Sequence, residues 1–375
     1  MRHTEETIRQ KKLAIIGASY LQVPLIDKAK KMGIETHCFA WKEGAEGAEH
    51  ADFFYDISVL EKDQILEKCA IIGIDGITTI ATDMPVPTIA HVAHHLGLPG
   101  NSLSSAEVST NKLEMRKRLQ QHGCNIPAFT TISAPGPKNL DVSFPVIVKP
   151  VDRSGSRGVS RVDKTEGLAS SVSYAIQESF SGTAIVESFI DGDEISVECI
   201  SWQGKHYLLA ITDKQTTGEP HFVELAHHQP SVFSSRKEEI MHAIFKALDA
   251  LEIKSGASHT ELKINSKGEI FVIEVGARMG GDFIGARLVE LSTGYDYLKG
   301  VVEVALGIFT EPVFTLHKNA GVYFLSEETK HLLPYFAANN EFDVEKKIFG
   351  ELKTIRNSND RSGYIIYQSD CRLSI

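Results

Sequence analysis

Two acidic residues of this chain could hold a divalent cation between them. Glu261 and Glu274 lie in "HTELKINSKGEIFVIEVGARMGG" (259–281), where two alternating apolar runs flank Ser-Lys-Gly. This pattern predicts a β-hairpin, and with 267–268 as a two-residue loop the two acids lie directly opposite each other. Opposed like charges destabilise a sheet, whereas Mg²⁺ is typically held by one or two carboxylates together with phosphates. Screening by Lys263 and solvent, or a register slipped by one residue, is the alternative.

A loop of small residues after an apolar run suggests a second function, the binding of an anion. In "FPVIVKPVDRSGSRGV" (144–159), Lys149 ends the run and glycines and serines follow it. Backbone N–H groups of such loops and a nearby ammonium both favour anions, so a polyphosphate is a candidate ligand. The string is neither G-x-x-x-x-G-K-[ST] nor G-x-G-x-x-G, which excludes the two commonest phosphate loops. From these residues alone, a mobile surface loop is an equal alternative.

One arginine follows the second hairpin acid directly. Arg278 lies in a glycine-rich segment with Gly276, Gly280 and Gly281. An arginine there could stabilise the charge that develops on a transferred phosphoryl group or on an oxyanion. It could also pair with a neighbouring acid.

The elements that must position these residues begin with an alternation of strands and helices. Strands are predicted at 12–19, 34–41 and 74–82, and helices at 23–33 and 84–100. Such alternation predicts a parallel, doubly wound sheet over about the first hundred residues. The turn after the first strand, "GASYLQ", lacks the second and third glycines of a dinucleotide-binding fingerprint, which disfavours a dehydrogenase.

The central part of the chain is predicted to be richer in strands. A basic helix, "STNKLEMRKRLQQHG", ends at Gly123, and "AIVESFIDGDEISVECI" (184–200) indicates two strands about an Asp-Gly turn. In the second strand Ile195 and Val197 face one side, and Glu194, Ser196 and Glu198 face the other. The acidic side is predicted to be the wet face of a half-buried sheet.

Composition excludes several classes of protein. The chain has 375 residues and a formal charge of −10, which argues against a general nucleic-acid binder. The five cysteines form no C-x-x-C pair, which fits reduced thiols. His91, His94 and His95 have helical spacing but no local carboxylate or cysteine to complete a metal site, so they are interpreted as a solvated helix face. No secretory signal and no apolar run of about 18 residues is found, so a cytoplasmic protein without membrane partners is expected.

Six elements occur in the order and spacing of a known family. A helical lysine ("NKLEMR", Lys112) precedes a strand-end lysine ("VIVKP", Lys149) and the loop "DRSGSRG". The segment "VESFIDGDE" then carries Glu187 and Glu194, and the two hairpin acids end in "EVGAR". The series resembles the ATP-grasp superfamily, and within it the carboxylate–amine ligases that are similar to bacterial L-amino-acid ligases, the dipeptide synthases.

The resemblance implies an α/β fold in three parts. A pre-ATP-grasp, Rossmann-like doubly wound parallel sheet is expected at residues 1–110. An ATP-grasp fold of two α+β subdomains that clasp ATP is expected at 111–310, with a mobile lid subdomain over about 130–185. A small closing domain is expected at 311–375, with a strand in "NDRSGYIIYQSD" and no chemistry of its own.

The resemblance also implies a role for each matching residue. The two lysines would bind phosphates, the loop would close over the β- and γ-phosphates, and Glu187 would lie near the adenine amino group, with the backbone of Ser188 and Ile190 reading the base edge. Glu194 would bind the ribose. The implied residues are, for ATP, Lys112, Lys149, Ser154, Gly155, Ser156, Glu187, Ser188, Phe189, Ile190 and Glu194; for metal, Glu261 and Glu274; for catalysis, Arg278; and for substrate, Glu224, His227, Arg278 and Gly281.

The activity that the resemblance implies is ATP-dependent ligation. ATP would phosphorylate a carboxylate, and an amine would attack the acyl phosphate to give an amide or peptide bond, ADP and phosphate. The expected cofactors are ATP as a substrate and one or two Mg²⁺ ions, with Mn²⁺ as a substitute. The expected partners are small carboxylate and amine substrates, amino acids first among them, without nucleic acid or membrane; a homo-oligomer is compatible with the sequence.

Two other functions stay open at this stage. One is a different ATP-grasp chemistry on bicarbonate, of the carbamoyl-phosphate-synthase or carboxylase kind. The other is a nucleotide-binding protein without turnover, against which the intact set Glu261, Glu274 and Arg278 argues. One departure from the family pattern concerns the metal: many ATP-grasp enzymes have E-x-N at the second metal ligand, whereas Gly276 takes the Asn position here.

Overall fold

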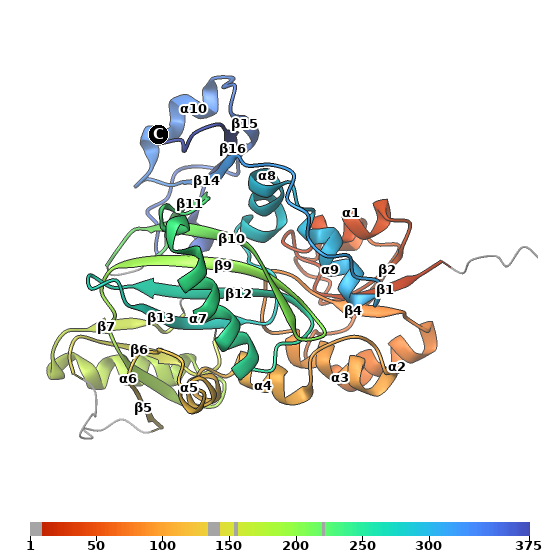
Figure 1. The fold of residues 1–375 in the computed structure, drawn as a ribbon, viewed down its shortest axis with the longest axis horizontal. Helices are drawn as coiled ribbons and strands as arrows, with labels where there is room; N and C mark the ends of the chain where they lie inside the picture. The colour runs from red at the N-terminus through yellow and green to blue at the C-terminus, as the bar shows by residue number, and fades with distance from the viewer. Residues whose placement is uncertain (1–9, 134–142, 154–156, 220–221) are drawn as a thin grey trace, which may run out of the picture.

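The structure is a computed structural model that describes residues 10–133, 143–153, 157–219 and 222–375. Its strands form three sheets (Figure 1). The N-terminal sheet lies at one end of the molecule, a long central sheet runs through the middle, and a small sheet with one helix lies beside the central one. This arrangement confirms the predicted ATP-grasp type of α/β fold.

The N-terminal sheet is parallel, as predicted, with the strand order β3-β2-β1-β4. Alternate residues of β1 point to opposite faces: Leu13 and Ile15 pack towards α1 and α9, and Ala14 and Ile16 pack towards α2 and α3. Both faces are therefore buried, which explains the uninterrupted apolar run. The strands are β1 (Lys12–Ile16), β2 (Glu35–Ala40), β3 (Phe53–Asp56) and β4 (Gly76–Thr78), and the helices are α1 (Val23–Lys31), α2 (Lys62–Ile72), α3 (Val86–Leu96) and α9 (Tyr297–Ala305).

Two connecting helices lead to the small antiparallel sheet, whose order is β5-β8-β6-β7. Helix α6 packs on it through Leu168, Val172 and Ala175. The elements are α4 (Leu103–Thr110), α5 (Lys112–Gln121), β5 (Phe129–Ile132), β6 (Val146–Pro150), β7 (Ser160–Val162), α6 (Leu168–Glu178) and β8 (Ala184–Ser188).

The central sheet is antiparallel and has the order β13-β12-β9-β10-β11-β14-β16-β15. The apolar face of β9 packs against α7 and α5, so its alternation is as predicted. The elements are β9 (Asp193–Trp202), β10 (Lys205–Thr216), β11 (Glu224–Gln229), α7 (Lys237–Ala250), β12 (Gly256–Ile264), β13 (Ile270–Gly276), α8 (Val289–Thr293), β14 (Asn319–Leu325), α10 (Leu333–Ala337), β15 (Asp343–Ile348) and β16 (Gly363–Ser369).

The last three strands of the chain extend this same sheet. Strand β14 pairs with β11, and β16 pairs with β14 and β15. Segments that lie far apart in the sequence are therefore held in one hydrogen-bonded layer, with the C-terminal part at its end (Figure 1). The domain boundaries at 110 and 310 stay predictions.

The β12–β13 hairpin has the predicted pairing of Glu261 with Glu274, but its turn and ladder differ from the prediction. The turn is not a two-residue loop, because Ile264 pairs with Ile270 and leaves five residues, 265–269, between the strands. A β-bulge then shifts the register, so that Glu261 still pairs with Glu274. Ile273 is the extra residue, and its carbonyl accepts a hydrogen bond from Arg116. A bulge inserts one residue into a ladder, and here it cancels the shift that the longer turn introduces.

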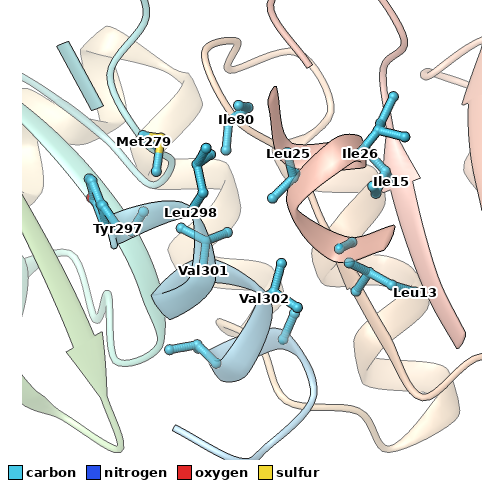
Figure 2. Packing of buried hydrophobic residues seen from close by; sticks show 14 of the residues in the cluster. Leu13, Ile15, Leu25, Ile26, Ile80, Met279, Tyr297, Leu298, Val301 and Val302 are labelled. Atoms are coloured by element: carbon cyan, nitrogen blue, oxygen red, sulfur yellow. The ribbon is translucent and has the colours of Figure 1, made fainter. Parts of the chain in front are cut away.

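One apolar cluster joins the N-terminal sheet to the rest of the chain. Leu25 of α1 faces Leu298, Val301 and Val302 of α9, whereas Ile26 lies beside Ile15 of β1 (Figure 2). Ile80 and Met279 lie next to each other at one edge of the cluster and form a parallel bridge. In the described part of the chain no helix is long and apolar enough to cross a membrane, and all five cysteines are free.

Replacement of Leu25 by Ala tests this joint. Leu25 is fully buried in the cluster, and a Leu→Ala change in a core costs about 2–5 kcal/mol because it removes contacts and leaves a cavity. Urea unfolding should show a loss of this size. Leu60→Ala is the control, since Leu60 is 54% exposed, and it should change the free energy of unfolding by less than about 0.5 kcal/mol. Equal effects of the two substitutions would contradict the assignment.

Candidate active site

The two hairpin acids lie directly opposite each other, and each has a lysine partner. Lys214 Nζ donates to Glu261 Oε1 at 2.8 Å, and Lys112 Nζ donates to Glu274 Oε1 at 2.9 Å. Burial alone would raise the pKa of Glu261, but Lys214 holds this pKa well below its ordinary value. The repulsion is therefore offset by lysines of two other elements, β10 and α5, and not by Lys263.

Lys214 joins three acids. Its buried ammonium lies 2.6 Å from Glu194, 2.8 Å from Glu261 and 3.6 Å from Glu224. Burial alone would lower the pKa of Lys214, but the three carboxylates raise it well above its ordinary value. This residue was not predicted from the sequence. A weak signal was available, because Lys214 comes three residues after the end of the apolar run "YLLAI".

A buried acid–imidazole pair supports the segment that follows β13. His259 Nδ1 lies 2.5 Å from Glu198 Oε1, and the backbone N–H of Gly280 donates to Glu198 Oε2 at 2.9 Å. Burial alone would lower the pKa of His259, but the Glu198 carboxylate raises it to about 9. The prediction of a wet face on β9 is wrong at Ser196 and Glu198, which are fully buried, because this segment covers that face of the sheet.

Lys112 lies at the start of α5, and Lys149 lies on β6, the strand that precedes the small-residue loop in the sequence. Lys112 opens α5, whose N-cap Asn111 accepts hydrogen bonds from two backbone N–H groups. Its ammonium donates to the carbonyl of Arg153 at 2.7 Å as well as to Glu274. Lys149 stands near the end of β6 and is buried. The loop residues Ser154, Gly155 and Ser156 lie outside the described residues.

Glu187 is held by two cations. Its carboxylate lies 2.7 Å from Arg116 Nε and 2.8 Å from Lys149 Nζ, and it is almost fully buried. Burial alone would raise the pKa of Glu187, but Arg116 and Lys149 lower it to about 2. Arg116 was not predicted, although its fully buried guanidinium sits in the same helix as Lys112. In this structure the carboxylate of Glu187 forms ion pairs with Arg116 and Lys149. Its contact with adenine stays a prediction.

The other residues predicted to bind the nucleoside lie where the chain passes from the small sheet to the central sheet. The backbone N–H of Ser188 donates to Ala128 O at 2.8 Å, so this group is already bonded. The ring of Phe189 lies under the Arg161 guanidinium at 4.3 Å. Ile190 follows it, and Glu194 near the start of β9 pairs with Lys214.

Arg278 is paired with an acid from the N-terminal part of the chain. Its Nε and Nη2 donate to the two carboxylate oxygens of Asp83 at 2.8 and 2.9 Å. Sequence analysis left open an ion pair or a catalytic role for Arg278; the ion pair is present, and catalysis stays a prediction. Asp83 itself was not predicted, because it lies 195 residues away from its partner along the chain.

Two of the predicted substrate residues, Glu224 and His227, form a cluster with Asp282 and Arg361, which were not predicted. Arg361 donates to Asp282 Oδ2 at 2.8 Å and to Glu224 Oε2 at 3.2 Å, and its guanidinium lies 3.7 Å from the centre of the Phe324 ring. Arg361 from the C-terminal segment thus pairs with a predicted substrate residue, and the expectation that this segment contributes no chemistry stays a prediction.

His227 is the neutral member of this cluster. It is buried, and its Nε2 lies 3.7 Å from Asp282. Burial lowers the pKa of His227 despite the nearby acid, and neither ring nitrogen has a hydrogen-bond partner among the described residues. Asp282 has a left-handed backbone, with φ of 49°, which is costly for a residue other than glycine and is typical of functional segments. Gly281 before it lies against Ala81.

The donors present fit a magnesium ion bound together with phosphates. Within the described residues no group of three or more His, Cys, Asp or Glu side chains could hold a metal alone. Glu261 and Glu274 offer oxygen donors from adjacent strands, and both already bind cationic groups in this structure. Mg²⁺ uses one or two carboxylates and takes further oxygens from phosphates and water. These two acids would be its protein ligands.

Comparison with known proteins agrees with this geometry. Residues 142–286 match the family described as "ATP-grasp domain". Alanine–anticapsin ligase of Bacillus subtilis (strain 168) is 28% identical over 245 residues, which covers 58% of this chain and 51% of that protein. The chain thus spans about half the length of the curated relatives it matches first.

Solved structures resemble the chain over nearly its whole length. The L-amino acid ligase from Bacillus licheniformis has a TM-score of 0.80 and 26% identity, covering 97% of this chain and 95% of that one. N5-carboxyaminoimidazole synthetase from Staphylococcus aureus, solved with ADP, has a TM-score of 0.79 and covers 96% and 94%; at 14% identity it shows the fold alone. The matched residues and the solved structure of the L-amino acid ligase together show that this chain has an ATP-grasp fold and carries an ATP-grasp domain at residues 142–286.

Proposed function

We propose that this protein is an ATP-dependent carboxylate–amine ligase that forms an amide or peptide bond through an acyl phosphate and releases ADP and phosphate. The observation that carries the proposal is the pair Glu261 and Glu274, opposed on one hairpin and neutralised by buried lysines. The repulsion of opposed acids costs stability, so the pair supports a bound cation, and together with Arg278 it exceeds what binding of a nucleotide requires. The resemblance to ligases supports the same activity.

The lysines would act on the phosphates of ATP. Lys149 lies on the strand before the loop predicted to cover the phosphates, and Lys112 donates to Arg153 O. Lys214 lies beside Glu194, the predicted ribose ligand. Magnesium, when bound by Glu261 and Glu274, would supply charge neutralisation for phosphoryl transfer. The lysines would then exchange a carboxylate partner for a phosphate oxygen, which keeps each buried ammonium paired. The ADP bound in a solved protein of the same fold supports ATP as the nucleotide.

Arg278 would stabilise the acyl phosphate and the oxyanion formed when the amine attacks. Arginine is always charged and its planar fork spans two oxygens, so it suits an intermediate with negative charge on both the phosphate and the former carboxylate. Positioned charge of this kind is usually the largest single contribution to catalysis. Alignment of the amine with the acyl phosphate in a closed site would supply much of the rest.

The acidic cluster supports an amino acid as one substrate. Glu224 and Asp282 share Arg361, and Lys214, which also lies near Glu224, is shared with two further acids, Glu194 and Glu261. The carboxylates therefore outnumber these cations, while His227 is neutral. The excess negative charge would attract the ammonium group of an amino acid. Arg361 would hold the two acids in place, and Gly281 would leave room for the substrate backbone. The pairing of two amino acids into a dipeptide is the specific form of the reaction that we propose.

Isotope transfer tests the proposal. The protein is incubated with ATP, Mg²⁺ and pairs of amino acids, and ADP release and product masses are recorded. With ¹⁸O in the carboxylate of the activated amino acid, an acyl phosphate delivers one labelled oxygen to the released phosphate. We expect labelled phosphate, ADP and a dipeptide. Unlabelled phosphate beside a ligated product, or AMP as the product, would exclude this route. ADP formation that requires bicarbonate would indicate the carboxylase-like alternative.

Removal of one hairpin carboxylate should stop ATP turnover and leave the fold intact. Glu274→Gln and Glu261→Gln each remove a metal ligand together with a buried repulsion. ATP turnover should fall at least about 10²-fold, the scale of losing one preorganised electrostatic contact, across a Mg²⁺ titration. Glu269→Gln is the control on the same hairpin, because Glu269 is exposed and bonds only to the turn. Normal ATP turnover in both site variants would contradict the proposal that Glu261 and Glu274 bind the metal.

Replacement of Glu187 by Gln should make the free energy of unfolding depend less on pH in the acidic range. The pKa of Glu187 is lowered to about 2, against an ordinary value of 4.5, so its ionised form stabilises the fold above pH 4.5 and loses this effect as the pH falls towards 2. The difference is worth about 3 kcal/mol. Urea unfolding should show the variant less stable by about this amount at pH 7, with the gap shrinking below pH 4.5.

The control for this experiment is Glu114→Gln, which breaks only an exposed pair with Lys117. It should cost less than about 1 kcal/mol at every pH. A gap between the wild type and Glu187→Gln that stays constant from pH 7 to pH 3 would show that Glu187 is not held ionised by its two cations.

A further inference from the structure

Asp83 contacts the proposed catalytic arginine from a different part of the molecule. It follows β4 of the N-terminal sheet, whereas Arg278 follows β13 of the central sheet. The two side chains share a two-point contact, from Nε to Oδ1 at 2.8 Å and from Nη2 to Oδ2 at 2.9 Å, and both are largely buried. Burial alone would raise the pKa of Asp83, but Arg278 holds it below its ordinary value.

Because residue 276 is a glycine, the Asp83 carboxylate can lie close to the backbone at that position. A Cβ on Gly276 would lie 2.8 Å from Asp83 Oδ1 and 3.1 Å from Arg278 Cζ, so the ends of these two side chains would have to shift to admit it. The departure from E-x-N therefore has a structural counterpart in this chain. The volume next to Glu274 that an asparagine would need is occupied by the Asp83–Arg278 contact.

The backbone around the contact is fixed on both sides. The N–H of Ala81 donates to the carbonyl of Met279 at 3.0 Å, and Ile80 pairs with Met279 in a parallel bridge. Both Ile80 and Met279 belong to the buried cluster between the N-terminal sheet and α9 (Figure 2). Asp83 thus approaches Arg278 from a rigid support, as a group that orients another side chain must.

The contact also determines which part of the guanidinium stays available. Hydrogen bonds within the described part of the structure use three of its five N–H groups: two with Asp83 and one, from Nη1 at 3.3 Å, with Met279 O. One N–H on each terminal nitrogen is left over. These two N–H groups remain able to donate to oxygens of an anion.

We propose that Asp83 is a positioning residue for Arg278, and that the N-terminal sheet thereby completes the active site through the space left by Gly276. The proposal rests on the proposed function, since it assigns a role to the arginine that would stabilise the acyl phosphate. Asp83 does not touch the substrate. It fixes the plane of the guanidinium, so that the two remaining N–H groups meet the intermediate without reorganisation.

The competing explanation is an ion pair that only fastens the N-terminal sheet to the rest of the chain. The protein contains a second pair of that kind, which serves as an internal control. Lys28 of α1 lies 2.6 Å from Asp296, which precedes α9. Asp296→Asn matches Asp83→Asn in size and charge, and asparagine remains a good N-cap for α9.

Steady-state kinetics of the full-length protein, with the amino-acid pair that the wild type joins, test the proposal. Asp83→Asn should lower kcat about 10- to 100-fold, the effect of a small misplacement of a catalytic group, and leave KM for ATP unchanged. Gly276→Ala keeps both charged groups but displaces them, so it should reproduce this loss. Asp296→Asn should leave kcat at the wild-type value even if it lowers Tm.

A double variant distinguishes two roles of Asp83: orienting Arg278 for catalysis, or only holding the N-terminal sheet against the rest of the chain. Arg278→Lys alone should lower kcat, and adding Asp83→Asn to it should lower kcat little further, because residues that act as a unit have non-additive effects. Losses that multiply, or a normal kcat in Asp83→Asn and Gly276→Ala with only a lower Tm, would overturn the proposal. A wild type that joins no pair of amino acids would instead refute the proposed function, which makes the two failures distinguishable.

Discussion

The opposition of Glu261 and Glu274 is the constraint on which the rest of the site depends. Two carboxylates facing each other across a hairpin are unfavourable unless cations compensate them, and the fold brings Lys112 from α5 and Lys214 from β10 to do so. Each lysine also contacts a residue in the region predicted to bind the nucleotide: Lys112 donates to Arg153 O, and Lys214 pairs with Glu194. Compensation of the two carboxylates thus also arranges the cations that a polyphosphate would need.

Much of the fold could be predicted because its signals are local. The uninterrupted apolar run of β1 indicates a strand covered on both faces, and the alternation of β9 separates Ile195 and Val197 from Glu194 and Ser196. The spacing alone predicted that Glu261 pairs with Glu274. The prediction missed both the longer turn and the bulge, and the effects of these two features on the register cancel. A two-residue turn without a bulge and a five-residue turn with one bulge place the same residues opposite each other.

The remainder of the site depends on contacts that no local pattern encodes. Asp83 and Arg278 are 195 residues apart, and Arg361 meets Glu224 from 137 residues away. Arg116 looked like one more charge in a basic helix, yet it is fully buried beneath Glu187. Glu198 looked like part of a solvated face, because its burial is caused by a segment that lies far beyond it in sequence. Tertiary structure decides the role of each of these residues.

The continuity of the central sheet orders the chemistry from one edge to the other. The acids proposed to bind metal lie on β12 and β13, Glu194 and Lys214 lie on β9 and β10, the proposed substrate acid Glu224 lies on β11, and Arg361 lies just before β16. The groups proposed for the nucleotide and those proposed for the substrate thus occupy neighbouring but separate strands. With these roles, evolution or engineering could vary the acceptor side through the C-terminal strands while the strands proposed to bind ATP keep their sequence.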